Sequence, residues 1–154
     1  MNIGILGAGN IAGSMARTIC GMAAQGRPVT LCAVASRSQE KADAFAKAYG
    51  IPRAYGSYAA MLNDPLVELV YIATPHSHHA EQIRQCVAAG KPVLCEKSFT
   101  ANAKQAEDVL REAETAGVYV AEAIWTRYMP ARGMIADIIA SGEIGEPRFL
   151  SANL

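Results

Sequence analysis

The sequence predicts an α/β protein built on a doubly wound parallel sheet. Three observations support this fold class. A short apolar strand from residue 2 runs into a glycine motif at residues 7–12, apolar runs alternate with helical segments up to residue 123, and polar residues follow the apolar runs directly. Strands that alternate with helices are joined by right-handed crossovers, and the result is a parallel sheet with helices on both faces.

The motif at residues 7–12, Gly-Ala-Gly-Asn-Ile-Ala, matches the G-x-G-x-x-A form of the dinucleotide-binding fingerprint. Gly7 permits a tight turn out of the strand, Gly9 lets the backbone approach a pyrophosphate, and the small Ala12 allows the helix to pack closely on the strand. A helix is expected over residues 11–24, and its first N–H groups would bind the anion. The motif therefore predicts a nucleotide cofactor near the N-terminus.

Apolar or Ala-rich runs that end at Gly, Pro, Asn or Asp predict the next elements. Gly50 ends the second helix, Asn63-Asp64-Pro65 ends the third, and Thr74-Pro75 stops the fourth strand. Strands are expected at residues 29–35, 53–55, 67–73, 92–95 and 118–123. Helices are expected at residues 39–49, 57–62, 79–89 and 102–116.

The pattern changes after residue 123, where a loop leads into a helix at about residues 131–140 and a strand at residues 147–154. We interpret residues 1–123 as a complete cofactor-binding domain. We interpret residues 124–154 as the first helix and strand of a second α/β domain, for substrate binding or oligomerisation, which this sequence leaves incomplete.

Composition excludes several classes of protein. Lys and Arg balance Asp and Glu at 14 each, which disfavours binding to nucleic acid or to an anionic membrane. No apolar run reaches the roughly 18 residues of a membrane span. The first strand begins at residue 2 and leaves no room for a signal peptide, so a cytoplasmic location is expected. The four cysteines have no C-x-x-C spacing, and we expect buried, reduced thiols.

Ligands of open α/β sheets bind beyond the carboxyl ends of the strands. After the second strand an NAD-binding site usually carries Asp or Glu for the ribose 2′-OH, but this chain has Ser36-Arg37-Ser38, with Lys41 one turn further. A guanidinium suits a 2′-phosphate, so these residues favour NADP over NAD. The alternative is an ordinary solvated helix N-terminus.

Three further clusters follow later strands. The segment Thr74-Pro75-His76-Ser77-His78-His79 is interpreted as a turn lining the cofactor. Its three histidines also suggest a metal site, but no Cys lies nearby and Glu81 is the one nearby carboxylate, which argues against that alternative.

In Glu96-Lys97, the ammonium of Lys97 could hold a substrate oxygen, or the two residues could be an exposed pair in a turn. Trp125 and Arg127 could bracket a nicotinamide or a phosphate, although core packing is the alternative for Trp125.

Five blocks in order, GILGAGNIA, ATPHSHHAE, AGKPVLCEKSFT, EAIWTRYMP and GEIGEPRFL, resemble the glucose-fructose oxidoreductase and inositol dehydrogenase (Gfo/Idh/MocA) family across essentially the whole chain. The segment WTRYMP and the Ser36-Arg37 pair are most similar to its dihydrodiol dehydrogenase branch, whose members oxidise trans-diols and some sugars with NADP. The resemblance implies a Rossmann domain followed by a substrate domain.

The resemblance and the loop positions together predict the site residues. Lys97, as the lysine of a Glu-Lys-Pro motif, and His76 are the predicted catalytic residues. Ser98 stands where the family has that proline, and we expect this change to loosen the placement of Lys97. The predicted cofactor contacts are Gly7, Gly9, Asn10, Ile11, Ser36, Arg37, Lys41, Thr74, Pro75, His79, Glu96, Lys97, Trp125 and Arg127.

These predictions describe the cofactor half of an NADP-dependent oxidoreductase. It would transfer hydride to or from a hydroxyl or carbonyl carbon of a vicinal diol, sugar or polyol, with an acid or base supplied by the rest of the second domain. The chain alone would be inactive, and the completed second domain would form a homo-oligomer. The alternative is a non-catalytic NADP-binding module that senses redox state or scaffolds a partner.

Overall fold

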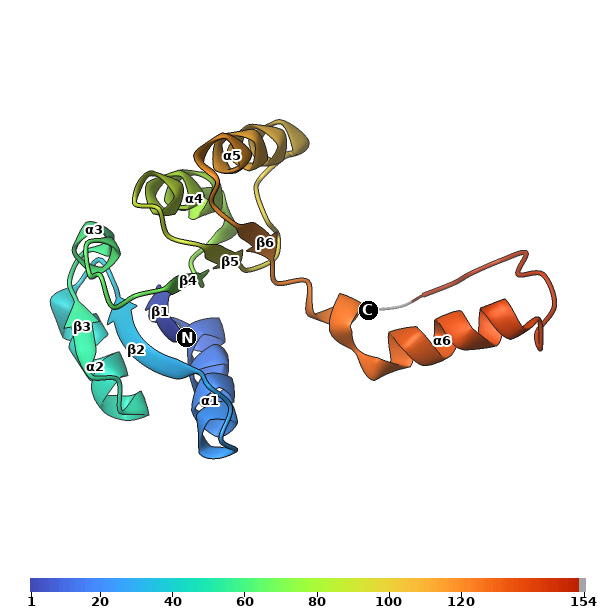
Figure 1. Ribbon diagram of the computed structural model, residues 1–154, viewed down its shortest axis with the longest axis horizontal. Helices are drawn as coiled ribbons and strands as arrows, with labels where there is room; N and C mark the ends of the chain where they lie inside the picture. The colour runs from blue at the N-terminus through green and yellow to red at the C-terminus, as the bar shows by residue number, and fades with distance from the viewer. Residues whose placement is uncertain (153–154) are drawn as a thin grey trace. The chain divides into compact units, whose positions relative to one another are not determined.

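The computed structural model describes residues 1–152, and the chain divides into a first unit, residues 1–123, and a second unit that begins at Ile124. The first unit contains a six-stranded sheet in the order β3-β2-β1-β4-β5-β6, with every neighbouring pair parallel (Figure 1). This confirms the predicted doubly wound sheet. The strands are β1 (Asn2–Leu6), β2 (Thr30–Ala35), β3 (Arg53–Tyr55), β4 (Leu69–Ile72), β5 (Val93–Cys95) and β6 (Val120–Glu122).

The helices of the first unit connect these strands in the expected order. They are α1 (Asn10–Ala24), α2 (Gln39–Tyr49), α3 (Tyr58–Leu62), the short 3-10 helix η1 (His76–His78), α4 (His79–Ala88) and α5 (Ala103–Ala116). Ser38 caps α2 by accepting a hydrogen bond from the backbone N–H of Lys41, and Asn102 caps α5 in the same way. Such caps satisfy N–H groups that a helix cannot bond internally, which explains why α2 begins at the predicted residue 39 and α5 begins at Ala103, one residue after the prediction.

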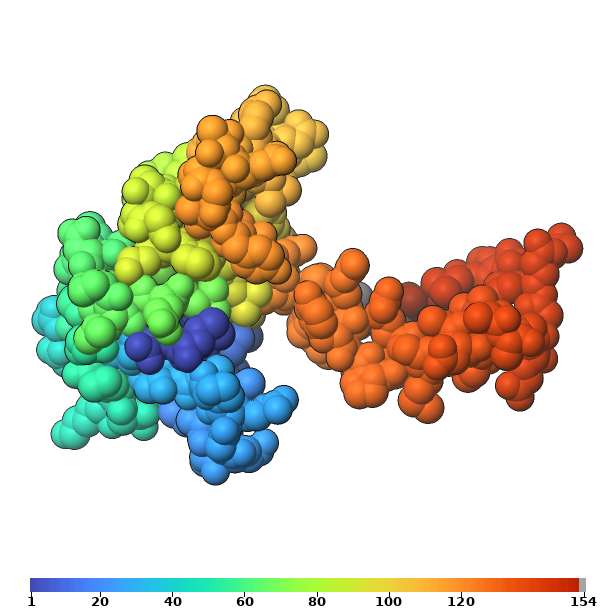
Figure 2. Space-filling model, viewed as in Figure 1, coloured from blue at the N-terminus to red at the C-terminus, as the bar shows by residue number. Residues whose placement is uncertain are grey.

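Each face of the sheet packs on its own set of helices, and the two faces form two cores. Side chains alternate along a strand, so in β4 Val70 and Ile72 face α3, α4 and α5 while Tyr71 faces α1 and α2. On the outside of the first unit α4 and α5 pack against each other (Figure 2). Burial on both faces explains why the strands are almost continuously apolar.

The second unit contains the 3-10 helix η2 (Trp125–Tyr128) and the helix α6 (Pro130–Ser141). The helix agrees with the prediction for residues 131–140. The strand predicted at residues 147–154 is wrong for residues 147–152, which form no strand, and residues 153–154 lie outside the described part. A strand needs a neighbour to satisfy its backbone N–H and C=O groups, and no strand of residues 1–152 pairs with this segment.

Two expectations from composition can be compared with the structure. Within residues 1–152 no helix is both long and apolar enough to cross a membrane. All four cysteines are free thiols, and Cys32, Cys86 and Cys95 are buried as expected. Cys20 is exposed, contrary to the expectation, because it lies on the solvent side of α1.

A cluster of polar groups holds the turns that lead into β4 and β5. The Asp64 carboxylate is 8% exposed and accepts hydrogen bonds from the Tyr55 hydroxyl at 2.9 Å and the Leu66 N–H at 2.9 Å. Arg53 Nε lies 3.0 Å from Oδ2 of Asp64, so the two side chains form an ion pair, but their geometry is poor for a hydrogen bond. Burial opposes ionisation, but these hydrogen bonds and the Arg53 charge prevail and lower the pKa of Asp64.

We expect Asp64→Asn to lower the free energy of unfolding by about 1 to 3 kcal/mol at pH 7, because it leaves the buried hydrogen-bond donors and Arg53 poorly paired. Urea denaturation measures the change. Asp108→Asn is the control, since Asp108 forms only surface ion pairs with Lys104 and Arg111 on α5 and should change stability little. Equal effects of the two substitutions would contradict the role of the cluster.

The lowered pKa of Asp64 also predicts a pH dependence. The carboxylate stabilises the folded chain fully above the ordinary Asp pKa of about 4, and this contribution is lost as the pH falls through the lower pKa of the folded state. The gap in stability between the wild type and Asp64→Asn should therefore narrow in acid. A gap that widened below about pH 4 would contradict the assignment.

Candidate functional site

The loops that follow β1, β2 and β4 meet at the carboxyl edge of the sheet. The Gly7 N–H donates to the Ala35 carbonyl at 2.8 Å, and the Ala73 N–H donates to the Leu6 carbonyl at 2.8 Å. These hydrogen bonds extend the strand ladders into the loops. The residues after each strand are therefore held at neighbouring positions along one edge.

The two glycines of the fingerprint have different surroundings. Gly7 has φ of 111°, and a Cβ atom there would lie 2.7 Å from the Ala73 carbonyl oxygen. At Gly9 the backbone is extended and a Cβ atom would meet no atom within 4 Å. The protein itself therefore requires Gly7, whereas Gly9 faces open space into which a ligand could approach the backbone.

That open space adjoins the N-terminus of α1. Gly9 is the N-cap and contributes no side-chain hydrogen bond, and the first turn contains no acidic residue. Asn10 and Ile11 are exposed there. The first N–H groups of a helix lack internal partners and carry a partial positive charge, so this end of α1 can accept an anion.

Ser36, Arg37 and Lys41 follow β2. The Ser36 side chain is buried and accepts a long hydrogen bond of 3.5 Å from the Ser38 N–H, while the side chains of Arg37 and Lys41 are exposed. The structure therefore places two exposed cations beside a short loop whose backbone is held by a hydrogen bond from the Ser36 N–H to the Tyr55 carbonyl at 3.0 Å.

A small recess joins this loop to the loop after β4. Sequence reasoning missed Tyr58 and Gln82, because nothing local to either residue marks it as a neighbour of Arg37. Burial raises the pKa of the Tyr58 hydroxyl, and the Arg37 charge opposes that shift, which agrees with their proximity. The residues lining the recess are Arg37, Tyr58, Pro75, His78 and Gln82.

The loop after β4 has an exposed and a buried part. Thr74 is half-buried, and Pro75 and His76 are exposed. His79 is 0% exposed, with Nε2 at 2.9 Å from the Thr74 carbonyl oxygen and Nδ1 at 2.8 Å from the Ser98 carbonyl oxygen. The predicted contact of His79 with the cofactor is not what the structure shows: its ring lies beneath the surface and links the loops after β4 and β5.

Contacts from other elements hold the loop after β5. Besides the His79 contact with Ser98, the Phe99 N–H donates to Glu122 Oε1 at 2.9 Å. The peptide between Lys97 and Ser98 is cis. Hydrogen bonds hold the two residues that follow Lys97, Ser98 and Phe99, while the expected loosening of Lys97 itself stays a prediction. The Lys97 side chain is exposed and forms no ion pair within residues 1–152.

Trp125 and Arg127 belong to η2 in the second unit. Trp125 is 61% exposed, which contradicts core packing within this unit, and Arg127 is also exposed. Their contact with a cofactor stays a prediction.

The histidine-rich turn shows no arrangement for a metal ion. Both ring nitrogens of His79 face carbonyl oxygens, and His76 and His78 are exposed. In the described part of the chain, no three His, Cys, Asp or Glu residues are grouped as metal ligands.

Solved structures share this fold. An NAD-binding oxidoreductase from Klebsiella pneumoniae has a TM-score of 0.83 and 34% identity, over 96% of this chain and 40% of that chain. A 3-ketoreductase from Actinomadura kijaniata, solved with NADP, has a TM-score of 0.85 and 30% identity, over 95% of this chain and 45% of that chain.

Curated relatives are dehydrogenases. Trans-1,2-dihydrobenzene-1,2-diol dehydrogenase of Mus musculus is 39% identical over 97% of this chain and 44% of its own length. D-xylose 1-dehydrogenase (NADP(+)) of Hypocrea jecorina is 38% identical over 92% of this chain and 38% of its own length. The chain thus spans less than half the length of these relatives.

The sequence model of one family, described as an oxidoreductase family with an NAD-binding Rossmann fold, matches residues 1–124. That range contains the whole parallel sheet and every loop of its carboxyl edge described above. The chain therefore belongs to the Gfo/Idh/MocA oxidoreductase family.

Proposed function

We propose that this chain binds NADP(H) and forms the cofactor half of an oxidoreductase that acts on a vicinal diol, sugar or polyol. The observation that carries the proposal is the carboxyl edge of the sheet, where open space over Gly9 and an uncapped helix adjoin the cationic Arg37. These residues fit an anionic dinucleotide. When bound, NADP would accept or donate the hydride at its nicotinamide ring.

The phosphates divide between two loops. The N–H groups of Asn10 and Ile11 would bind the pyrophosphate, because they lie at the positive end of α1 beside Gly9. Ser36, Arg37 and Lys41 would bind the 2′-phosphate, for which a guanidinium offers paired donors. The xylose dehydrogenase named for NADP(+) and the NADP-bound ketoreductase support this choice over NAD.

The strand order suggests where the nicotinamide half would lie. Arg37 follows β2 on one side of β1, whereas Thr74 follows β4 and Glu96 follows β5 on the other side. An extended dinucleotide with its pyrophosphate over α1 and its 2′-phosphate at Arg37 must run toward β4 and β5. We therefore propose that Thr74, Pro75, Glu96 and Lys97 contact that half.

Lys97 and His76 are the proposed catalytic residues. The Lys97 ammonium is exposed at this edge and would stabilise negative charge on the substrate oxygen while the hydride moves. The exposed His76 would face the substrate. We propose that the remaining substrate contacts come from a region that corresponds to the part of the longer relatives not matched by this chain. The present chain by itself would bind the cofactor but would not turn over substrate.

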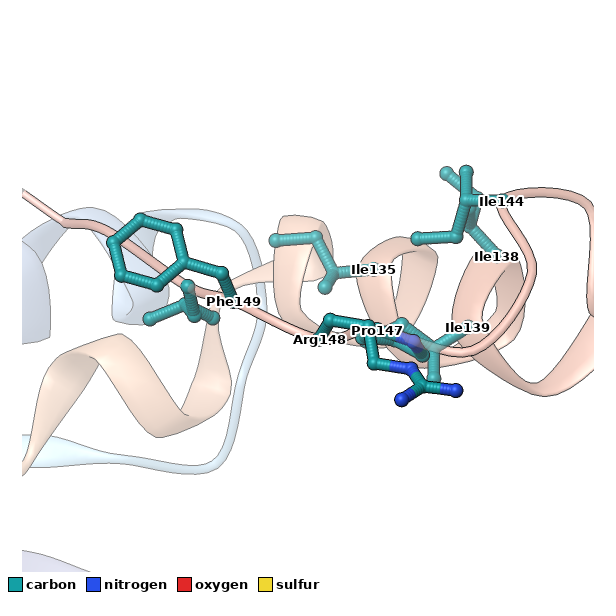
Figure 3. A pocket seen from close by; sticks show the side chains of 8 residues that line it. Ile135, Ile138, Ile139, Ile144, Pro147, Arg148 and Phe149 are labelled. Carbon is teal, nitrogen blue, oxygen red and sulfur yellow. The ribbon is translucent and has the colours of Figure 1, made fainter.

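The second unit supports a proposed role in oligomerisation. Isoleucines of α6 and the segment that follows it line a shallow apolar groove (Figure 3), formed by Ile135, Ile138, Ile139, Ile144, Pro147, Arg148, Phe149 and Leu150. The same surface favours a second candidate, a non-catalytic NADP-binding module that holds a partner protein. Saturable turnover of a diol or sugar by the complete protein would exclude that candidate.

Calorimetric titration of the chain with NADPH and NADH in parallel tests the proposal. We expect NADPH to bind more tightly, because only NADPH carries the 2′-phosphate. Equal affinities would leave the fold assignment intact and remove the 2′-phosphate site. Binding of neither dinucleotide would contradict the proposed function of this chain.

Substitution of the two glycines should separate folding from binding. Gly7→Ala should lower the free energy of unfolding by about 2 to 4 kcal/mol, because φ is positive and the methyl group meets the Ala73 carbonyl. Gly9→Ala should leave stability nearly unchanged and weaken NADPH binding about 10-fold or more, since its methyl group occupies the phosphate's approach. Thermal unfolding and calorimetry measure the two effects, and a Gly9→Ala variant with full affinity would refute the pyrophosphate assignment.

Arg37→Asp should reverse the cofactor preference. Removing the guanidinium should weaken NADPH binding by about 10- to 100-fold, and the new carboxylate can accept a hydrogen bond from the ribose 2′-OH of NADH. Arg27→Asp makes the same charge change in the exposed turn between α1 and β2, at the opposite edge of the sheet. That control should keep the wild-type ratio of affinities, and an unchanged ratio in Arg37→Asp would defeat the 2′-phosphate assignment.

A further inference from the structure

The phenol of Tyr71 connects the core of the sheet to the site. Tyr71 lies in β4 and is 1% exposed, packed in the core between the sheet and the helices α1 and α2. Its hydroxyl donates a hydrogen bond to Oε1 of Glu96, directly after β5. A buried aromatic ring therefore ends in a donor at the edge where the cofactor is proposed to bind.

Strand register explains this contact. Tyr71 pairs with Leu94 in the neighbouring strand β5. Because side chains alternate along a strand, Leu94 and Glu96 lie on the same face as Tyr71. The Tyr71 ring can thus reach Glu96 along one face of the sheet, although 25 residues separate the two in sequence.

The Glu96 carboxylate is held at both oxygens. Oε1 accepts from Tyr71, and Oε2 accepts from the backbone N–H of Lys97 at 3.1 Å. The Glu96 N–H donates to the Ile72 carbonyl at 3.0 Å, which fixes its backbone. Burial raises the pKa of the Tyr71 hydroxyl, and the hydrogen bond to Glu96 and its charge raise it further. The phenol therefore stays protonated and remains a donor.

We propose that Tyr71 is a positioning residue that orients the Glu96 carboxylate for the nicotinamide half of the cofactor. The inference rests on the proposed function. Tyr71 is too deeply buried to touch a ligand, so it acts through Glu96. Without the phenol, Oε1 of Glu96 loses its hydrogen-bond donor and the carboxylate can adopt other rotamers. Binding of the cofactor would then have to restrict these rotamers, and the lost conformational entropy would weaken the affinity.

A matched tyrosine provides the control. Tyr55 also donates its hydroxyl to a carboxylate, that of Asp64, in the cluster that precedes β4. Tyr55→Phe and Tyr71→Phe each remove one hydroxyl that bonds to a carboxylate and keep the ring. The two variants therefore separate a loss of stability, which both should show, from a loss of cofactor positioning, which only Tyr71→Phe should show.

The test uses two ligands with the whole chain. NADPH contains both halves of the cofactor, whereas 2′,5′-ADP contains the adenosine half without the nicotinamide. Tyr71→Phe should weaken NADPH binding about 10-fold and leave the affinity for 2′,5′-ADP unchanged. Tyr55→Phe should change neither affinity. Calorimetry gives the affinities, and thermal unfolding confirms that each variant is folded at the temperature used.

Three other outcomes would contradict either the positioning role of Tyr71 or the proposed function. Wild-type affinity of Tyr71→Phe for NADPH would refute positioning by Tyr71 and leave the proposed function standing. Equal losses for both ligands would show a general structural role. A wild-type chain that binds neither ligand would refute the proposed function, and the inference with it.

A double-mutant cycle tests whether Tyr71 acts through Glu96. In a Glu96→Ala background the carboxylate is already gone, so Tyr71→Phe should cause no further loss of NADPH affinity. A further loss of the same size as in the wild-type background would show that Tyr71 acts by another route and would overturn the proposal.

Discussion

The structure depends on the close fit of the first turn between two neighbouring strands. The Gly7 N–H donates to the Ala35 carbonyl at the end of β2, and a side chain on Gly7 would meet the Ala73 carbonyl after β4. This contact lies where the order of the strands changes direction, with β2 and β3 on one side of β1 and β4 to β6 on the other. Connections on the two sides pass over opposite faces, and the edge between them is where open α/β sheets bind ligands.

The polar groups at the amino ends of the strands differ from those at the carboxyl ends. Before β4 and β5, Asp64 is surrounded by donors, and the Lys91 ammonium donates to the carbonyls of Asp64 and Val67. At the carboxyl end the N-terminus of α1 has no side-chain cap, and Arg37 and Lys97 are exposed. Paired polar groups stabilise the first end, whereas unpaired donors and cations at the second can bind an anion. A net charge of zero is compatible with this, because binding depends on local groups.

Buried and half-buried side chains hold the loops of the site in place. His79 links the loops after β4 and β5, Glu122 accepts from the backbone of Phe99, and Tyr71 reaches Glu96 through the core. Hydrogen bonds that are shielded from water restrict the backbone more than exposed ones. The loop with Lys97 is thereby fixed by contacts from β4, α4 and β6, which reduces the ordering that a ligand would otherwise have to impose.

The sequence by itself determined the parallel sheet, the glycine turn and the bounds of elements such as α2 and β3, because these follow from local patterns of apolar, capping and turn residues. Only the tertiary structure decided that His79 lies inside, that Cys20 lies outside, and that residues 147–152 form no strand. It also brought Tyr58 to Arg37 and Tyr71 to Glu96. These outcomes depend on which helix face meets the sheet and on strand register, and contacts between residues far apart in the chain set both.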